Sequence, residues 1–401
     1  MSPAFDPLAP ASRRPRVAWV MHSVFNAKFF LVPHLRMLGE EHEVLLYLRN
    51  DAPEILANLD IPARVVEIPI VRHVDPLADL KALWVLYRAL RRDRPDLVHS
   101  TTAKGGLIGM LAAFFARVPR RVHTFQGEAW PHFTGVKRWL FKALDRLVAW
   151  LATEVTVVSA SERDFLRDQG VLPPNRGLVL GSGSICGVDL ERFYPDAERR
   201  AAKRAELGYV EGDFVILYLG RLQRDKGLHI LDAALQKLTA RSDQPIHVLA
   251  VGPDEDGLGE GLVRTFGAGV QVLPYTDTPE DFIAAADILV LPSFREGFGM
   301  VLIEAAAMGV PSVASRIYGI TCAVAENQTG LLFDVGDPQA MADAMERLLT
   351  DGGLRRRLGE NGINRTRAEF DQKVVIEHFR QFYRAQLAEW VPRASDKGER
   401  R

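Results

Sequence analysis

Short apolar runs that alternate with helix-length segments constrain this chain more than any other feature of its sequence. In the first part of the chain the apolar runs are typical of buried strands, and segments with helical periodicity, such as 77–90 and 136–151, separate them. Strands and helices in alternation predict a parallel α/β sheet that is covered on both faces. The expected strands are 16–21, 42–48, 65–68, 96–100, 121–125 and 154–158.

The pattern stops at a glycine-rich connector, 181–195, and then starts again. A second α/β domain is therefore expected, so that two Rossmann-like parallel-sheet domains, 16–185 and 186–373, face a cleft. Ligands of such sheets bind beyond the carboxyl ends of the strands. Residues 1–15 are expected to be disordered, and an aromatic-rich helix at 374–391 must pack on another part of the chain. The second set of expected strands is 214–219, 246–251, 270–273, 288–291, 313–314 and 330–333.

Charge and cysteine content narrow the class of protein. The net charge of −1 over 401 residues argues against a nucleic-acid partner. Residues 88–146, however, carry 12 Lys and Arg against 4 Asp and Glu, which indicates an anionic partner for the first domain. Cys186 and Cys322 have no metal-binding spacing, so no metal site is expected, and two cysteines suit a reducing cytoplasmic setting. No signal peptide or transmembrane helix is expected, because the longest apolar run, 107–116, is about half of a bilayer span.

The stretch 293–304 carries the strongest chemical signal. It follows the strand 288–291 and opens a helix, so Glu296 lies in a strand-to-helix loop and Glu304 lies inside the helix, roughly 12 Å away along its axis. Gly297, Phe298 and Gly299 lie between the two carboxylates, at a helix N-terminus that favours anions. This arrangement suits the sugar, diphosphate and ribose of a sugar nucleotide. The alternative is an acid at a helix start followed by a solvated helix residue.

The segment 220–227 follows another strand of the second domain and precedes a helix. Arg221 offers a fixed fork for phosphate oxygens, and Lys226 offers a mobile point charge. Such cations can neutralise the charge that develops on a diphosphate leaving group. The segment is not a P-loop, because it lacks Gly-Lys-Ser/Thr. An ordinary basic surface loop is the alternative.

Two positions of the first domain are weaker candidates. His123 ends the strand 121–125 and is expected to face the cleft, where it could bind the transferred sugar or its phosphate, although a lone histidine is more often structural. Lys104 precedes a helix and could contact an anion. The glycines of 181–187 have a spacing one residue too long for a dinucleotide fingerprint and are interpreted as a hinge.

The helix 136–151 combines a basic face with Trp and Phe. It could lie on an anionic membrane surface. The alternative is a helix that packs on the first sheet with solvated lysines.

Together these segments resemble glycosyltransferase family 4, the retaining enzymes with the GT-B fold, over nearly the whole chain. The resemblance rests on Gly220-Arg221 with Lys226-Gly227, on Glu296 and Glu304 as a Glu-x7-Glu motif, and on the linker around Gly187-Val188-Asp189. The segments 100–107, 123–127 and 181–189 look closer to the bacterial capsule and lipid-linked oligosaccharide transferases.

The resemblance implies a role for each candidate. Glu296 would hold hydroxyls of the donor sugar, Glu304 the ribose, and Arg221 with Lys226 the diphosphate. Many members have His-Gly where this chain has Gln126-Gly127, so either His123 or Gln126 could meet the donor. Retention in this family is usually assigned to a front-face mechanism, in which the leaving phosphate takes the proton of the acceptor. The helix at the end of the chain would cross back onto the first domain.

The sequence therefore predicts a cytoplasmic, peripheral-membrane, retaining and metal-independent glycosyltransferase. Its co-substrate would be a nucleotide diphosphate sugar, expected to be UDP-linked, with no other cofactor. Its acceptor would be a lipid-linked glycan precursor in the biosynthesis of a bacterial surface polysaccharide or oligosaccharide. The alternatives are a transferase with a soluble small-molecule acceptor, a non-catalytic sugar-nucleotide-binding regulator, and a GT-B isomerase or phosphorylase.

Overall fold

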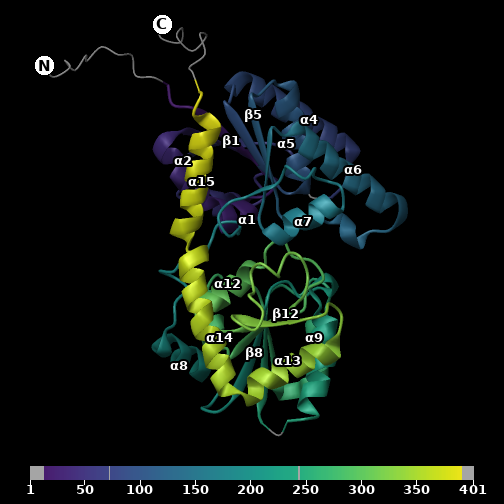
Figure 1. Cartoon of the computed structure of the whole chain (residues 1–401), viewed down its shortest axis with the longest axis vertical. Helices are drawn as coiled ribbons and strands as arrows, with labels where there is room; N and C mark the ends of the chain where they lie inside the picture. The colour runs from purple at the N-terminus through teal and green to yellow at the C-terminus, as the bar shows by residue number, and fades with distance from the viewer. Residues whose placement is uncertain (1–12, 72, 243, 391–401) are drawn as a thin grey trace, which may run out of the picture.

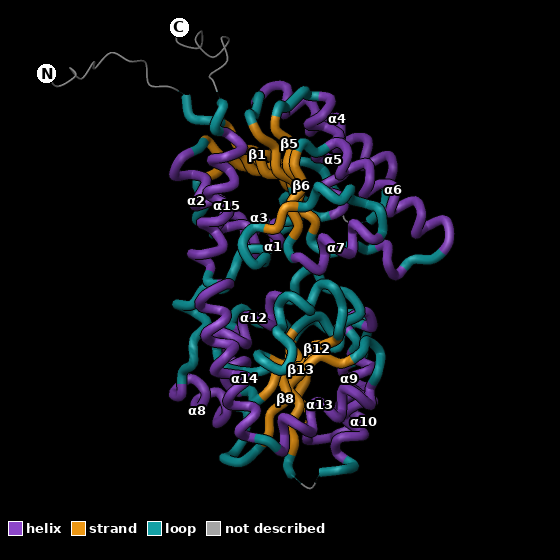
Figure 2. The backbone as a smooth tube through the Cα atoms, viewed as in Figure 1, coloured by secondary structure: helices purple, strands orange, loops and turns teal. Residues whose placement is uncertain are grey.

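The computed structural model describes residues 13–71, 73–242 and 244–390, which form two parallel sheets with helices around them (Figure 1). Figure 2 shows the two sheets as separate groups of strands. The expected fold class, two Rossmann-like α/β domains, is confirmed. Of the disordered tail expected at 1–15, residues 1–12 lie outside the described residues. Residue 391, the last of the expected C-terminal helix, also lies outside them.

The first sheet has seven parallel strands: β1 (Arg16–Val20), β2 (Glu43–Leu48), β3 (Ala63–Glu67), β4 (Leu97–Thr101), β5 (Arg120–Phe125), β6 (Glu154–Val157) and β7 (Leu178–Val179). Their order is β3-β2-β1-β4-β5-β6-β7. Strands β2 and β3 lie on one side of β1 and the later strands on the other, so the strand order reverses between β1 and β4. The central strands are buried because helices cover both faces. Strand β1 is accordingly apolar after Arg16, whereas β4 also buries the polar residues His99, Ser100 and Thr101.

Helices connect these strands: α1 (Val24–Asn26), the π-helix η1 (Ala27–Leu31), α2 (Val32–Glu41), α3 (Pro53–Ala57), α4 (Pro76–Asp93), α5 (Ala103–Phe115), the 3-10 helix η2 (Trp130–His132), α6 (Gly135–Leu151) and α7 (Ala160–Asp168). Ser159 caps α7, since its hydroxyl accepts from the Glu162 N–H at 3.0 Å.

The second sheet has six parallel strands: β8 (Phe214–Leu219), β9 (Ile246–Val251), β10 (Val270–Leu273), β11 (Ile288–Leu291), β12 (Ser312–Ser315) and β13 (Gly330–Phe333). Their order is β10-β9-β8-β11-β12-β13, and the reversal lies between β8 and β11. The helical segments of this half are α8 (Ala197–Glu206), η3 (Arg224–Lys226), α9 (Leu228–Thr239), α10 (Gly259–Phe266), η4 (Gly267–Gly269), α11 (Pro279–Ala285), α12 (Met300–Ala307), α13 (Pro338–Thr350), α14 (Gly352–Arg365), η5 (Thr366–Phe370) and α15 (Gln372–Leu387).

Two segments cross between the domains, and they pair with each other. The Val188 N–H donates to the Phe370 carbonyl at 2.7 Å, and the Gln372 N–H donates to the Val188 carbonyl at 2.9 Å. Helix α15 then runs along the first domain (Figure 1). Its Phe379 and Tyr383 are buried in a core that also contains residues of β1, β2 and α2.

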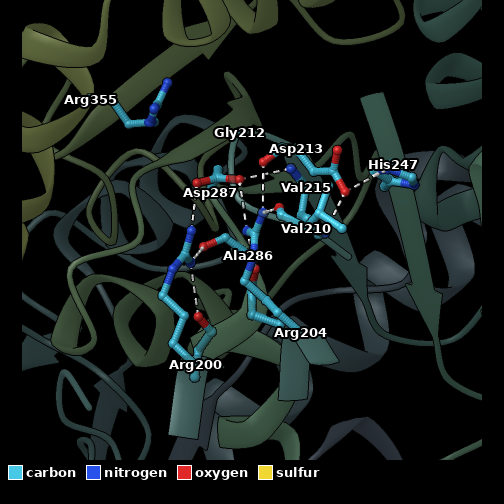
Figure 3. A network of polar contacts seen from close by, with 12 residues as sticks. Arg200, Arg204, Val210, Gly212, Asp213, Val215, His247, Ala286, Asp287 and Arg355 are labelled. Atoms are coloured by element: carbon cyan, nitrogen blue, oxygen red, sulfur yellow. Dashed lines mark hydrogen bonds and ion pairs between the residues drawn. The ribbon is translucent and has the colours of Figure 1, made fainter. Parts of the chain in front are cut away.

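None of the residues of helix α8 is buried, so the helix has no apolar face that packs in the core. An ion cluster attaches it to the second domain instead. Arg200 Nη2 lies 2.8 Å from Asp287 Oδ1, and Arg204 Nη1 lies 3.3 Å from Asp287 Oδ2 (Figure 3). Asp287 also accepts the Val215 N–H at 2.8 Å. The cluster lies where β8 and β11 begin, so it stabilises the edge of the sheet away from the carboxyl ends of these strands.

The sequence did not predict β7, α1, α3, α8, α10 or α14. Thr278 precedes α11 without a side-chain cap, and its hydroxyl lies 3.3 Å from that of Thr276. Within the described ranges, no helix combines the length and the apolar character that crossing a bilayer requires.

Candidate functional site

The candidate site forms where β8 and β11 end, at the reversal of strand order in the second sheet. The loop after β8 carries Arg221 and leads into η3, which ends at Lys226. The loop after β11 carries Glu296 and leads into α12, which contains Glu304. Loops that diverge at such a reversal leave a crevice that open α/β proteins use for ligands. The four predicted residues therefore share one edge of one sheet.

Lys226 and Glu296 form the centre of the site. Lys226 Nζ lies 2.8 Å from Glu296 Oε1 and donates to the Arg295 carbonyl at 3.1 Å. The Ser293 hydroxyl donates to the same carboxylate oxygen at 2.8 Å. Both charged side chains keep 16% of their surface exposed, so they are fixed in position yet open to a ligand. The pair thus presents a cation and a hydrogen-bonding carboxylate side by side.

Arg221 is held less firmly than Lys226. Its Nη1 lies 3.8 Å from Glu255 Oε2, and a third of the side chain is exposed. The Tyr218 hydroxyl donates to the Arg221 carbonyl at 2.7 Å and so fixes the backbone. The guanidinium is thus free to change partner when an anion binds.

The N-terminus of α12 adds backbone donors. Gly299 is its N-cap, in the left-handed region at φ 67°, and no side chain caps the helix. The Leu302 N–H donates to the Gly299 carbonyl at 2.9 Å, and the N–H groups of Met300 and Val301 have no partner among the described residues and remain for a ligand. The ring of Phe298 is buried against Phe370, with 5.5 Å between ring centroids, so a contact between Phe298 and a donor would come from its backbone.

Glu304 lies among other ionisable groups of the second domain. Burial raises its pKa to about 7, an effect opposed by the positive charge of Arg192 and reinforced by the negative charge of Glu280. Arg192 Nη2 lies 2.7 Å from Glu280 Oε2 and also donates to the Asp277 carbonyl. A carboxyl group in this environment can accept hydrogen bonds from hydroxyl groups.

The first domain meets this site through the loop after β5. A Cβ built on Gly127, which has φ 87°, would lie 2.8 Å from the Gly297 Cα, and one built on Gly297 would lie 2.5 Å from the Gln126 carbonyl oxygen. The backbones of 126–127 and 296–297 therefore touch, and only glycine fits on either side. Gln126 is thus adjacent to Glu296 although the two belong to different domains.

His123 lies deeper than the sequence suggested. It is 2% exposed, and its Nδ1 lies 2.9 Å from the Ser100 hydroxyl. A Cβ on Gly106 would lie 2.4 Å from its Cε1, so the ring packs against α5. Burial lowers its pKa to about 3, and the imidazole is therefore neutral at physiological pH. Its surroundings support the structural alternative at least as well as contact with a donor.

Lys104 points to a neighbouring helix of its own domain. Its Nζ lies 2.7 Å from Asp79 Oδ1 on α4 and also donates to the His73 carbonyl. It would have to exchange these partners to bind a donor.

A second contact between the domains flanks Glu304. Lys28 of η1 lies 2.6 Å from Asp277, which also accepts the hydroxyl of Tyr275 at 2.7 Å. The ring of Tyr275 in turn packs edge-on against Phe29, at 6.3 Å. No local pattern in the sequence predicts this contact, because 249 residues separate Lys28 from Asp277.

Sequence reasoning also missed the residues that support the loop after β5. The Gly127 N–H donates to Glu162 on α7, and Tyr318 of the second domain donates to Glu128 at 2.9 Å. Of these residues, Glu162 could have been placed at the start of a helix from the sequence, because Ser159 and Glu162 have the spacing of a capping box. Among the described residues there is no group of three or more His, Cys, Asp or Glu that could hold a metal ion.

Models of two glycosyltransferase domains match the two halves of the chain. The model "Glycosyl transferase 4-like domain" matches residues 31–183, and the model "Glycosyl transferases group 1" matches residues 199–365. The chain is 30% identical over 326 residues to the capsular polysaccharide biosynthesis glycosyltransferase CapM of Staphylococcus aureus, covering 80% of this chain and 85% of the relative.

Two further proteins bear on the site. The UDP-Gal:alpha-D-GlcNAc-diphosphoundecaprenol alpha-1,3-galactosyltransferase of Escherichia coli is 26% identical over 335 residues, which cover 81% of this chain and 83% of that enzyme. The crystal structure of Anabaena HepE in complex with UDP-glucose superposes with a TM-score of 0.76 at 21% identity, over 92% of this chain and 99% of HepE. This last likeness shows that the two proteins have the same fold.

Proposed function

Because the chain belongs to the glycosyl transferases of group 1, we propose that it moves a sugar from a nucleotide diphosphate donor to a lipid-linked glycan precursor. The observation that carries this proposal is the Lys226–Glu296 pair, 2.8 Å apart, directly beneath the backbone of Gln126 and Gly127. A cation and a carboxylate at the junction of two domains suit a donor held by one domain and an acceptor held by the other.

Each part of the donor has a partner in this proposal. Arg221, Lys226 and the free N–H groups of α12 bind the diphosphate, Glu304 binds ribose hydroxyls, and Glu296 binds hydroxyls of the transferred sugar. The donor is a UDP-sugar. The name of the Escherichia coli relative, which specifies UDP-Gal, and the UDP-glucose bound to HepE support this choice.

The proposed reaction retains the anomeric configuration and needs no metal. As the bond from the sugar to the diphosphate breaks, Lys226 and Arg221 stabilise the negative charge on the leaving oxygen. The same oxygen takes the proton of the acceptor hydroxyl on the front face of the sugar, where the new bond forms. Glu296 holds the sugar during this step, so its carboxylate is a positioning group rather than a nucleophile.

We further propose that the acceptor is presented at the inner face of the plasma membrane, in the biosynthesis of a surface polysaccharide or oligosaccharide. The name of the Staphylococcus aureus relative, which specifies capsular polysaccharide biosynthesis, supports this acceptor class, as does the diphosphoundecaprenol in the name of the Escherichia coli enzyme.

The outer face of α6 supports membrane contact. Val136 is 80% exposed, and Trp139 is 66% exposed. The exposed Lys137 and Arg138 lie beside these two residues. Apolar side chains can enter the headgroup region while the cations bind anionic lipids.

Helix α4 extends this apolar face. It packs with α6 on either side of α5, and all three cover the same side of the first sheet (Figure 1). Leu77, Leu80 and Trp84 lie on the exposed stripe of α4, at 82%, 63% and 57% exposure. We propose an anionic bilayer as the partner of this face, because the exposed Lys137 and Arg138 lie beside the apolar residues of α6.

A panel of nucleotide sugars tests the function, with release of the nucleoside diphosphate measured with and without membrane extract. We expect release from one UDP-sugar only, dependent on the extract. The variant Glu296→Ala should lose release, and the control variant Glu346→Ala, on the exposed face of α13, should keep it. If the nucleoside diphosphate is released without extract when a soluble acceptor is present, the acceptor is a soluble molecule and not a lipid-linked one. Donor binding without release under any condition would point to the regulator and contradict the transferase.

Sedimentation with vesicles tests the membrane face. Trp139→Ala should lower binding to vesicles that contain anionic lipid, whereas Tyr194→Ala, which removes an aromatic side chain 41% exposed in the connector 181–195, should not. Equal binding by both variants would contradict a role for α6.

A further inference from the structure

The segment that follows β12 reaches from the second domain into the first. The ring of Tyr318 stacks on Phe165 of α7, with centroids 4.2 Å apart and an interplanar angle of 7°. The Tyr318 carbonyl accepts the hydroxyl of Ser161, at the start of α7. The Tyr318 hydroxyl donates to Glu128 Oε2 at 2.9 Å. Two contacts of its side chain and one of its main chain thus fix Tyr318 across the domain junction.

This segment also supports the loop that carries Glu296. A Cβ on Gly319 would lie 2.0 Å from the Glu296 carbonyl oxygen, so the backbones of 296 and 319 are in direct contact. A movement of Tyr318 is therefore transmitted to the backbone of Glu296 through a single residue.

On the other side of the junction, buried carboxyl groups fix the loop after β5. Glu162 is fully buried and accepts the N–H groups of Gly127 and of Val158, the latter at 2.9 Å. Glu128 follows Gly127 directly and is 3% exposed, and its Oε1 has no hydrogen-bond partner among the described residues. The Tyr318 hydroxyl is thus the only side-chain donor to Glu128 in the described part of the chain.

We propose that Tyr318 and Glu128 are positioning residues that hold the loop 126–127 of the first domain on the loop 296–297 of the second. This inference rests on the proposed transferase activity, since these two loops carry the donor contacts of that proposal. Neither residue touches the donor in it. They set the distance between the two halves of the site, and a buried hydrogen bond with a stacked ring gives one preferred distance.

The carboxyl groups around Tyr318 also make the contact sensitive to pH. Burial, together with the charges of Glu162 and Asp145, raises the pKa of Glu128 well above its usual range. Burial raises the pKa of Glu162 and of Asp145 to about 7. The groups that face Glu128 are Tyr318, Glu162 of α7 and Asp145 of α6. At high pH the carboxyl groups of Glu128, Glu162 and Asp145 gain negative charge together. Deprotonation of Glu128 strengthens the hydrogen bond that it accepts from Tyr318, but the repulsion from Glu162 and Asp145 is the larger of the two effects. The loop after β5 and its contact with Tyr318 should therefore loosen as pH rises above neutrality.

The test compares Tyr318→Phe, which keeps the stacked ring and removes the hydroxyl, with Tyr209→Phe. Tyr209 is also buried, but its hydroxyl has no partner among the described residues, and it packs near His247, away from the carboxyl ends of the strands. We expect Tyr318→Phe to raise the KM for the donor by about tenfold, as for loss of a hydrogen bond to a buried carboxyl group, and Tyr209→Phe to leave it unchanged. Glu128→Gln keeps an acceptor for Tyr318 without a titrating group, so it should move the alkaline rise of the donor KM to higher pH.

Hydrogen exchange of a peptide covering 126–128 gives a readout that needs no activity. Tyr318→Phe should accelerate this exchange relative to the wild type and to Tyr209→Phe. Unchanged exchange would overturn the proposal whatever the kinetics show, and faster exchange with an unchanged donor KM would overturn the positioning role. If the wild type transfers no sugar, the proposed function fails and the positioning role with it, and the exchange result then shows separately whether the contact between Tyr318 and Glu128 exists.

Discussion

Replacing Gly127 with alanine tests whether the two loops of the site must touch for activity. The new Cβ would lie 2.8 Å from the Gly297 Cα and 2.9 Å from the Gly297 nitrogen, whereas ordinary contact begins at 3.4 Å. Both neighbouring atoms belong to the backbone, so no side chain can rotate away. The loops, and with them the two domains, must separate by about 0.6 Å.

Two costs follow from this substitution. An L-residue at φ 87° is strained by about 1–2 kcal/mol, which lowers the free energy of unfolding. The separation acts on the site itself, where a misplacement of about 1 Å can reduce a rate by about 100-fold. For about 0.6 Å we expect kcat/KM to fall by about 10- to 100-fold.

Gly208 provides the matched control. It has φ 78°, and a Cβ on it would meet nothing within 4 Å. Gly208→Ala should therefore cost similar stability in urea denaturation while leaving kcat/KM for the donor unchanged. Equal kcat/KM for the two variants would refute the argument, because backbone strain alone would then explain both.

Three further predictions address the charged groups. Lys226→Met should lower kcat by about 100- to 1,000-fold in steady-state assays, because it removes a cation from the leaving diphosphate, and a change confined to KM would contradict that role. Glu304 binds its proton more tightly when folded, because burial raises its pKa to about 7, so the free energy of unfolding should fall by up to about 3 kcal/mol from pH 4.5 to pH 7. Glu304→Gln should flatten that fall in urea denaturation, and an unaltered slope would contradict it. Asp287→Asn should cost about 3 kcal/mol of stability, because it removes the carboxylate that pairs with Arg200 and Arg204, yet preserve kcat/KM; lost activity in folded protein would contradict a purely structural cluster.

Periodicity in the sequence was enough to predict the fold, and its failures have physical causes. Helix α8 buries none of its residues, since Arg200 and Arg204 attach it through Asp287, so it shows no apolar stripe to detect. Strand β7 has two residues, too few for any pattern. The boundaries of the strongly periodic elements agree with the structure to within a few residues, because burial on both faces leaves an apolar run that ends where the strand ends.

The site could be predicted only in part. Lys226 and Glu296 were placed at one sheet edge because each follows a parallel strand, but their direct pairing depends on β8 and β11 being neighbours, which no local pattern specifies. The contact of Tyr318 with Glu128 spans 190 residues and two domains. An isolated tyrosine in a loop has no spacing or partner that reveals such a contact.

The two contacts that flank the site differ in strength, and this difference favours one direction of opening. Lys28 and Asp277 are 30% and 67% exposed, and an exposed ion pair contributes only about 0–1 kcal/mol, which salt screens further. Tyr318 is half-buried and instead meets the buried Glu128 and the half-buried ring of Phe165, where a stacked ring adds about 0.5–1.5 kcal/mol beyond its buried area. Strands β4 and β5 separate the two contacts, since Lys28 follows β1 and Phe165 follows β6. The domains should therefore part first at Lys28, beside Glu304, while the buried contact keeps the loops at Gly127 in register, so that a nucleotide enters at the weakly held side of the site.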